Sequence, residues 1–290
     1  MVPQVAVMQQ ARCYHDQEMN EADVAPFAGG AAAVFSARSP GKAAPNEDSA
    51  ALIPFNEQAG VLVVADGLGG GIAGEHASRL AVEAMQHAVL EAAHDGQSLR
   101  TAILNGFEQA NQRVLSHGGG AATTLAAVEI DGRTVRPYHA GDSTIVVVGQ
   151  RGKIKLQTVS HSPVGYAVEA GVLDPVDAMQ HADRHLVSNV VGAATMRIEV
   201  GPSLTLTPRD TVLLASDGLH DNLHDDEIIE RLRKGPLSMV MQRLADDARS
   251  RMATPDGSTP CKPDDLTFVV YRPVAGEWRA EGGRRKAEGR

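Results

Sequence analysis

Two short, almost entirely apolar runs each lead into an Asp-Gly pair, and they constrain the fold more than any other feature of the sequence. Residues 61–65 (VLVVA) precede Asp66-Gly67, and residues 212–215 (VLLA) precede Ser216 and then Asp217-Gly218. Runs of this length predict strands that are buried on both faces. A carboxylate at the end of such a strand is costly unless it shares a cation or reaches water.

Two further acidic pairs, Glu47-Asp48 and Asp264-Asp265, also stand where a turn meets a predicted strand. A single Asp-Gly after a strand is most often a tight turn. Four acidic pairs in one chain, two of them in nearly identical settings, weaken that explanation. Carboxylate oxygens without a matching set of His or Cys suit hard cations such as Mg²⁺ or Mn²⁺. The sequence therefore predicts a metal site.

The order of the surrounding motifs resembles the metal-dependent protein phosphatases, the type 2C serine/threonine family (PPM), in its bacterial form. The resemblance covers residues 31–272 nearly throughout and implies an α+β fold, a four-layer α-β-β-α sandwich of two antiparallel sheets flanked by helices. It also implies a dinuclear Mn²⁺ or Mg²⁺ centre between the sheets. The matching segments are NED at 46–48, VVADGLGGGIAGEHAS at 63–78, ATTLAAV at 122–128, AGDS at 140–143, ASDGL at 215–219 and DDLTFVV at 264–270.

By position in these motifs, the resemblance implies a set of metal ligands. Glu47 would reach a metal through water, and Asp142 of AGDS would hold a third, weaker ion mainly through waters. Asp142 could instead be an ordinary Asp that starts a turn. Asp264 is preferred to Asp265, because Asp265 stands where the family has Asn. The implied direct ligands of the two tight ions are Asp48, Asp66, the Gly67 carbonyl, Asp217 and Asp264.

The implied reaction is hydrolysis of phosphoserine and phosphothreonine monoesters by attack of a metal-bridging water or hydroxide. Two divalent ions about 3.5–4 Å apart lower the pKa of a bridging water and stabilise the attacking and leaving oxygens. Neither Cys13 nor Cys261 lies in the Cys-x5-Arg pattern of the thiol phosphatases. Phosphoprotein substrates and a cognate Ser/Thr kinase are the expected partners.

The sequence departs from the family pattern at the phosphate-binding position. The family usually places an Arg four residues before the Glu of NED, where this chain has Ala43. Lys42 is the nearest cation and Arg38 the next, so Lys42 is our candidate phosphate ligand; a solvated loop cation is the alternative. Leu68 stands where many eukaryotic members have a His, which leaves the general acid unassigned. A non-catalytic phosphatase-fold protein that binds a phosphoprotein is the second hypothesis.

Residues 69–74 also satisfy G-x-G-x-x-G after a predicted strand, which is the pattern of a dinucleotide site. That motif requires a second strand with a ribose-binding acid about 20 residues later. The pattern predicts another helix there instead.

Composition narrows the remaining possibilities. A net charge of −9 argues against nucleic acid as the main partner. Two distant cysteines give no disulfide framework. No signal peptide or run of about 18 apolar residues is present, so we expect a cytoplasmic protein without a membrane segment.

Periodicity and turn residues predict the order of elements. Residues 1–30 are expected to be an N-terminal extension, mobile or forming one poorly docked turn; residues 31–272 form the catalytic domain, with a mobile flap at about 160–185; residues 273–290 form a disordered tail. Helices are predicted at 74–93, 98–115, 225–234 and 237–251. Strands are predicted at 31–36, 49–54, 61–65, 122–130, 134–140, 144–149, 153–158, 197–206, 211–215 and 267–271.

Overall fold

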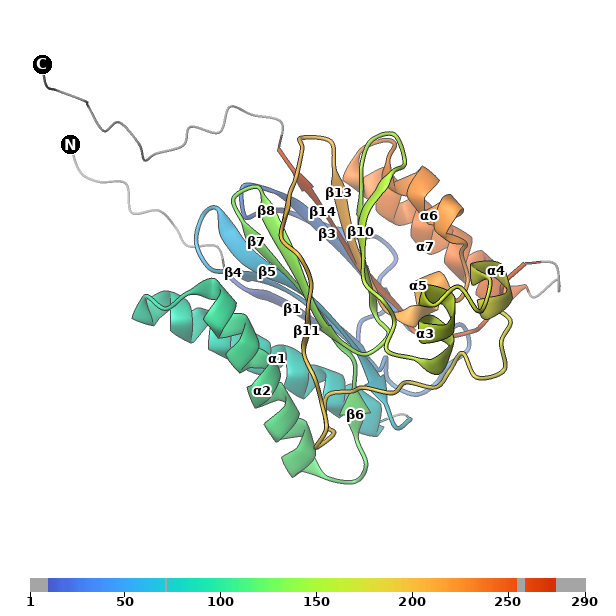
Figure 1. Ribbon diagram of the computed structural model, residues 1–290, viewed down its shortest axis with the longest axis horizontal. Coiled ribbons are helices and arrows are strands. Elements are labelled where there is room, and N and C mark those ends of the chain that lie inside the picture. The colour runs from blue at the N-terminus through green and yellow to red at the C-terminus, as the bar shows by residue number, and fades with distance from the viewer. Residues whose placement is uncertain (1–9, 71, 255–258, 275–290) are drawn as a thin grey trace, which may run out of the picture.

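Two antiparallel sheets face each other in the computed structural model, which describes residues 10–70, 72–254 and 259–274. Helices α1 (Ile72–Asp95) and α2 (Leu99–His117) cover the outside of the first sheet, and α6 (Asp225–Leu232) and α7 (Leu237–Ala253) cover the outside of the second (Figure 1). The predicted four-layer α-β-β-α sandwich is confirmed.

The first sheet has the order β1-β4-β5-β7-β8-β11, with β6 beside β5 and β12 beside β8. Its strands are β1 (Arg12–His15), β4 (Asp48–Pro54), β5 (Ala59–Leu68), β6 (Ala122–Thr123), β7 (Leu125–Asp131), β8 (Thr134–Ala140), β11 (Glu199–Val200) and β12 (Leu204–Thr205).

The second sheet has the order β10-β9-β13-β14-β3-β2. Its strands are β2 (Asp23–Phe27), β3 (Gly30–Ala37), β9 (Thr144–Val148), β10 (Ile154–Gln157), β13 (Thr211–Ala215) and β14 (Leu266–Pro273). Three short helices complete the described elements: α3 (Pro163–Glu169), α4 (Pro175–Ala178) and α5 (Asp217–His220).

The apolar runs at 61–65 and 212–215 lie in central strands whose side chains alternate between two cores. Val63 of β5 packs under α1 and α2, whereas Val64 packs between the sheets. Leu213 of β13 packs under α6 and α7, and Leu214 packs between the sheets. Burial on both faces explains why residues 61–65 and 212–215 carry no polar side chain.

The pairing register brings the acidic pairs to one end of the sandwich. Asp48, the first residue of β4, lies opposite Asp66 near the end of β5. Ala215, the last residue of β13, lies opposite Phe268 near the start of β14, so Asp217 and Asp264 leave the second sheet at a common edge. The fold therefore positions carboxylates from both sheets at the same end of the sandwich.

The expectation of a mobile or poorly docked segment at residues 1–30 was wrong for the part that the structure describes. β1 and β2 are edge strands, one in each sheet. Tyr14 and Phe27 are 7% and 3% exposed and pack between the sheets, which explains why these strands dock. Residues 1–9 lie outside the described part of the chain, as does the predicted tail from residue 275 onward.

Other predicted strand boundaries also differ from those in the structure. The single strand predicted at 197–206 is two short strands, β11 and β12, interrupted at Gly201 and Pro202, where Pro202 has no N–H to donate. The strand predicted at 122–130 divides into β6 and β7 at Thr124. The expected flap region contains α3 and α4.

The glycines of the two Asp-Gly pairs permit close backbone contacts. A Cβ on Gly67 would lie 2.1 Å from the Gly74 carbonyl oxygen, and a Cβ on Gly218 would lie 2.0 Å from the Asp265 carbonyl oxygen. Gly67 lies within β5 and Gly218 within α5, so neither pair is a simple hairpin turn.

We predict that Gly67→Ala and Gly218→Ala each lower the free energy of unfolding by about 1–3 kcal/mol or more, because the backbones must separate to admit the methyl group. Chemical denaturation measures the change. Gly149→Ala is the control, since its nearest neighbour is the flexible end of Lys155 at 3.2 Å. Equal, small losses in all three variants would contradict the packing argument.

Candidate metal centre

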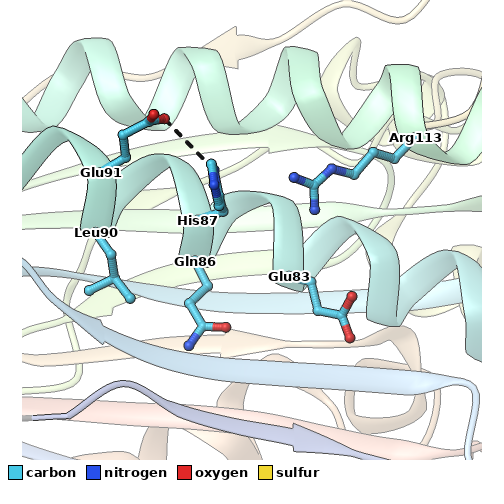
Figure 2. Close-up of a pocket in the computed structure, with 6 residues that line it drawn as sticks. All are labelled: Glu83, Gln86, His87, Leu90, Glu91 and Arg113. Atoms are coloured by element: carbon cyan, nitrogen blue, oxygen red, sulfur yellow. Dashed lines mark ion pairs between the residues drawn. The ribbon is translucent and has the colours of Figure 1, made fainter.

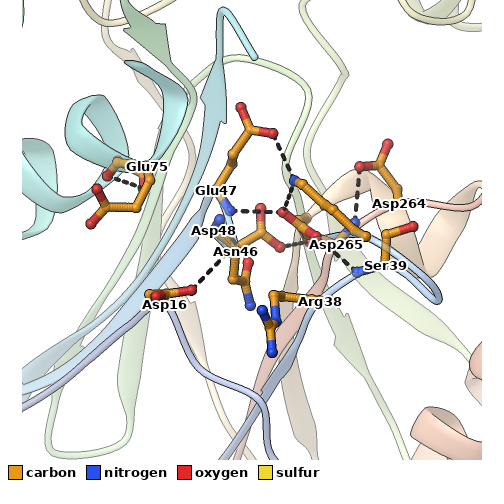
Figure 3. Close-up of polar contacts among 12 residues, drawn as sticks. Asp16, Arg38, Ser39, Asn46, Glu47, Asp48, Glu75, Asp264 and Asp265 are labelled. Atoms are coloured by element: carbon orange, nitrogen blue, oxygen red, sulfur yellow. Dashed lines mark hydrogen bonds and ion pairs between the residues drawn. The ribbon is translucent and has the colours of Figure 1, made fainter. Parts of the chain in front are cut away.

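The first carboxylate of the centre, Asp48, is fixed by a buried loop. Asn46 is wholly buried, and its side-chain oxygen accepts the Asp48 N–H at 2.9 Å. The Asn46 N–H in turn donates to Asp16 at 2.8 Å, and the Asn46 amide donates to the Gln17 carbonyl. The N-terminal segment thus supports the loop that carries Glu47 and Asp48 (Figure 3).

The second carboxylate, Asp66, is held by the two threonines of the ATTL motif. Its backbone N–H donates to Thr124 Oγ1 at 2.9 Å, and its carbonyl accepts from Thr123 Oγ1 at 2.8 Å. Ser143, next to Asp142, hydrogen-bonds Thr124 Oγ1 at 2.7 Å. These contacts tie the AGDS segment to the end of β5.

The second sheet supplies Asp217 and Asp264. Asp217 begins α5 directly after Ser216, whose hydroxyl donates to Asp48 Oδ2 at 2.8 Å across the two sheets. Asp264 precedes β14, and one of its oxygens accepts the Asp265 N–H. Figure 3 shows Glu47, Asp48, Asp264 and Asp265 gathered in one region.

Burial and mutual repulsion perturb the carboxyl groups of this centre. Burial, followed by the charges of neighbouring aspartates, raises the pKa of Asp48 and of Asp66 well above the usual range. Burial and repulsion from Asp217 raise the pKa of Asp142 to about 7. Burial also raises the pKa of Asp217 and Asp264, although Lys262 opposes the shift at both.

This electrostatic pattern fits divalent cations. The charges of Asp48, Asp217, Asp264 and Asp142 each raise the pKa of Asp66, so these four carboxyl groups lie close enough to repel it. Carboxylates so arranged are stable together when a cation neutralises them. All the donors are oxygens, as hard divalent ions require.

Two lysines contact the acidic residues, but each meets more than one carboxylate and so neutralises only part of the negative charge. Lys42 Nζ lies 2.7 Å from Glu47 and 2.6 Å from Asp265. Lys262 Nζ contacts Asp217, and lies 2.8 Å from Asp221 and 3.1 Å from Asp264. The sequence analysis did not single out Lys262 or Asp221. The available signal was the position of Lys262, two residues before the candidate ligand Asp264.

Asp265 is an acceptor for the loop that carries Glu47. It accepts the Ser39 N–H at 2.8 Å, the Glu47 N–H at 2.7 Å and the Lys42 ammonium. Burial opposes the Lys42 charge, but hydrogen bonds to Asp265 and Glu47 raise the Lys42 pKa overall. Arg38, the other candidate phosphate ligand, pairs instead with Glu18 at 3.0 Å.

A groove of about 710 Å³ opens from the centre between α3 and α4 on one side and α5 and α6 on the other. Asp142, Asp217 and Asp221 line it where it meets the metal centre. Much of the remaining lining is apolar, and acidic residues also contribute. The apolar residues are Val159, Val164, Val168, Pro175, Val176, Ala178, Met179 and Leu223; the further acidic residues are Glu169, Asp225 and Asp226, and Arg184 is a cation in the same lining.

A smaller cavity of about 450 Å³ lies on α1 and α2, beside the ion pair of His87 and Glu91 at 3.8 Å (Figure 2). It is lined by residues of the C-terminal half of α1 and by Arg113, whereas the N-terminal end of α1 faces the metal centre through Gly74. It contains none of the predicted site residues.

Residues 39–253 match the family model for protein phosphatase 2C. The chain belongs to this family. It is 30% identical over 219 residues to the serine/threonine protein phosphatase PstP of Mycobacterium tuberculosis. That match covers 72% of this chain and 40% of PstP, so the chain spans less than half the length of this relative.

Solved phosphatase structures have the same fold. The Streptococcus agalactiae serine/threonine phosphatase aligns with a TM-score of 0.70 and 25% identity, covering 83% of this chain and 98% of that one. The catalytic domain of PstP in complex with two manganese ions aligns with a TM-score of 0.64 and 27% identity, covering 84% of this chain and 97% of that one.

Within the phosphatase 2C frame, Gly74 has a structural role. A Cβ there would lie 2.2 Å from Glu47 Oε1 and 2.8 Å from the Gly67 carbonyl oxygen. The glycine thus lets the start of α1 approach the metal centre. This contact accounts for the G-x-G-x-x-G match without a nucleotide.

His139, His161 and Glu199 form a second cluster of metal-ligand residue types. The two rings are stacked, with centroids 4.3 Å apart and planes 16° apart. His139 Nε2 donates to the Val159 carbonyl, and His161 Nδ1 accepts from the Gly141 N–H. His161 Nε2 lies 3.0 Å from Glu199, so three of the four ring nitrogens already have partners, and we assign this cluster to packing of the Asp142 loop.

We predict that the metal-free protein loses stability as pH rises from 5 to 8. Carboxyl groups with raised folded-state pKa values stabilise the fold below the unfolded pKa of about 3.9, and that contribution disappears as pH passes the folded pKa. For Asp142 the folded value is about 7. Thermal unfolding across this range, with and without Mn²⁺, measures the effect.

Mn²⁺ should remove most of this pH dependence by neutralising the carboxylates. A metal-free midpoint that is flat or rises from pH 5 to 8 would contradict the electrostatic account.

A second prediction concerns Asp265. Asp265→Asn would install the residue that the family resemblance implies, but it would disturb the three contacts that the carboxylate accepts. An amide has one acceptor oxygen, so its NH₂ would face a donor, and the free energy of unfolding should fall by about 1–3 kcal/mol. The control is Asp247→Asn, which breaks a half-exposed pair with Arg231 and should cost less than about 1 kcal/mol. Equal losses in denaturant titrations would contradict this role.

Proposed function

We propose that this chain is a metal-dependent protein phosphatase that hydrolyses phosphoserine and phosphothreonine monoesters. The observation that carries the proposal is the convergence of Asp48, Asp66, Asp142, Asp217 and Asp264, from both sheets, where a groove opens. Membership of the phosphatase 2C family and the manganese complex of a solved relative support it.

The proposed ligands of two tightly bound Mn²⁺ or Mg²⁺ ions are Asp48, Asp66, the Gly67 carbonyl, Asp217 and Asp264. Asp142 is proposed to hold a third, weaker ion. Such ions, when bound, lower the pKa of coordinated water and stabilise charge on phosphoryl oxygens.

The neighbouring loop of Lys42 and Glu47 is proposed to orient the substrate. Lys42 lies at the edge of the centre, 2.7 Å from Glu47, and the Asp265 carboxylate fixes its direction. Lys42 is the better placed of the two candidate phosphate ligands because it contacts Glu47 beside the centre, and its two carboxylate contacts leave one of its three N–H donors for a phosphate. We propose that Glu47 acts through water, as the family resemblance implies.

The cysteines are unsuited to replace this chemistry. Burial raises the pKa of Cys13 to about 11, which keeps it a thiol rather than a nucleophilic thiolate. Cys261 donates its S–H to the Arg251 carbonyl at 3.2 Å. Attack by metal-activated water therefore remains the proposed route, in preference to a covalent enzyme intermediate.

The groove supplies the proposed binding site for the peptide around the phosphorylated residue. Its apolar residues can pack against neighbouring side chains, while Glu169, Asp225 and Asp226 favour a basic residue near the phosphate by charge complementarity. We propose phosphoproteins with basic flanking residues as substrates, and a Ser/Thr kinase of the same pathway as the opposing enzyme.

A non-catalytic phosphoprotein-binding role is the second hypothesis. Its basis was the altered Arg position near Ala43. The structure favours catalysis, since Lys42 reaches the same region and each proposed carboxylate ligand lies in the cluster. We place this activity in the cytoplasm as a proposal; within the described residues no helix is both long and apolar enough to cross a membrane.

We predict that a chelator abolishes release of phosphate from a phosphothreonine peptide and that Mn²⁺ or Mg²⁺ restores it. Asp66→Asn and Asp217→Asn should each lower kcat by about 100-fold or more, because each removes a charge from the metal centre. Asp23→Asn, at the surface, is the matched control. Full turnover after exhaustive chelation would overturn the proposed function.

The groove is tested with peptides that differ in one flanking residue. Glu169→Gln and Asp226→Asn should lower kcat/KM for a phosphopeptide with a flanking Arg by about two- to fivefold, as for exposed ion pairs. The same variants should leave hydrolysis of p-nitrophenyl phosphate unchanged, because that substrate does not reach the groove. Equal losses on both substrates would show that the groove does not select the peptide.

A further inference from the structure

Lys262 is a cation inside the metal centre that the family resemblance does not account for. Its side chain is 22% exposed, and its ammonium contacts three carboxylates, those of Asp217, Asp221 and Asp264. Two of these, Asp217 and Asp264, are proposed metal ligands. The Lys262 ammonium and a divalent ion would therefore compete for the same carboxylate oxygens.

The backbone of Lys262 is fixed in this position by a buried asparagine. Asn222 is wholly buried; its oxygen accepts the Lys262 N–H at 2.9 Å, and its amide donates to the Lys262 carbonyl at 2.9 Å. The same amide donates to Gly218 in α5. Lys262 is thereby held beside the helix that begins with Asp217.

The contacts of Asp264 make the competition direct. One of its oxygens accepts the Asp265 N–H at 2.9 Å, and the other contacts Lys262. A divalent ion that binds Asp264 must take its place beside the ammonium or displace it. Two positive charges on one carboxylate repel each other, so either arrangement weakens the binding of the ion.

We propose that Lys262 is a built-in competitor for the divalent ion held by Asp217 and Asp264, and that it lowers metal affinity at this position. Loading of the centre then follows the concentration of free metal, and the ammonium neutralises the carboxylates when the ion leaves. This inference rests on the metal site proposed above, but not on turnover.

Phosphate binding by Lys262 is the competing explanation, and the geometry disfavours it. An ammonium group has three N–H donors. Three carboxylates surround Lys262, enough to engage all of them. A phosphate ligand needs donors that face the substrate, whereas these face the ligands of the metal.

Calorimetric titration of the metal-free full chain with Mn²⁺ tests the proposal. Lys262→Met and Lys262→Gln should bind Mn²⁺ about tenfold tighter or more, because a positive charge within a few ångströms has been removed. Lys155→Met is the matched control: Lys155 is 25% exposed and forms a comparable pair with Asp210 at 2.6 Å. Its loss should leave Mn²⁺ affinity unchanged.

Unfolding of the metal-free variants gives a second, independent readout. Without Lys262 the three carboxylates are uncompensated, so Mn²⁺ should raise the thermal midpoint of Lys262→Met more than that of the parent. If neither variant folds without metal, both are folded in Mn²⁺ and release of the ion to a fluorescent chelator is timed. Slower release than from the parent supports the proposal; equal or faster release overturns it.

The remaining outcomes separate the two proposals. A parent that binds Mn²⁺ and hydrolyses phosphopeptide, with Lys262 variants of equal or weaker Mn²⁺ affinity, would overturn this inference alone. Unchanged Mn²⁺ affinity with weaker binding of inorganic phosphate would make Lys262 a substrate contact instead. A parent that binds no Mn²⁺ would remove the metal site and both proposals.

Discussion

Repulsion among buried carboxylates is the constraint on which the rest of this structure depends. The charges of Asp48, Asp217, Asp264 and Asp142 act on Asp66. Buried hydrogen bonds hold these carboxylates in place. Thr123 and Thr124 fix Asp66, and Ser216 bridges to Asp48. Such a cluster costs folding free energy that a bound cation offsets. Stability and proposed catalysis therefore depend on the same ions.

The sequence predicted the sandwich and the clustering of the acidic pairs because local signals and the motif order of the family resemblance agreed. The apolar runs before Asp66 and Asp217 are strands buried on both faces, and the motif order implied the partners of each. It did not predict β1 and β2, because four or five residues of mixed polarity form no pattern that identifies an edge strand. Tyr14 and Phe27 dock only once both sheets exist. Lys262 was missed for the same reason, since its contacts require Asn222 and α5 to come together.

The departures from the family pattern are connected in space. Lys42, which stands near the position of the missing Arg, pairs with Asp265, which replaces the family's Asn. The cation and the anion form one pair, and both contact Glu47: Lys42 its side chain and Asp265 its backbone N–H. Lys262 adds a second internal cation at the other side of the centre. In this chain, Lys42 and Lys262 contact carboxylates of the proposed metal centre.

Anomalous diffraction at the manganese edge, from crystals grown or soaked in Mn²⁺, tests the central claim most directly. The account predicts two strong peaks among Asp48, Asp66, Asp217 and Asp264, with the Lys262 ammonium displaced from at least Asp264. An absence of peaks at these carboxylates, or peaks at His139 and His161 in their place, would contradict it.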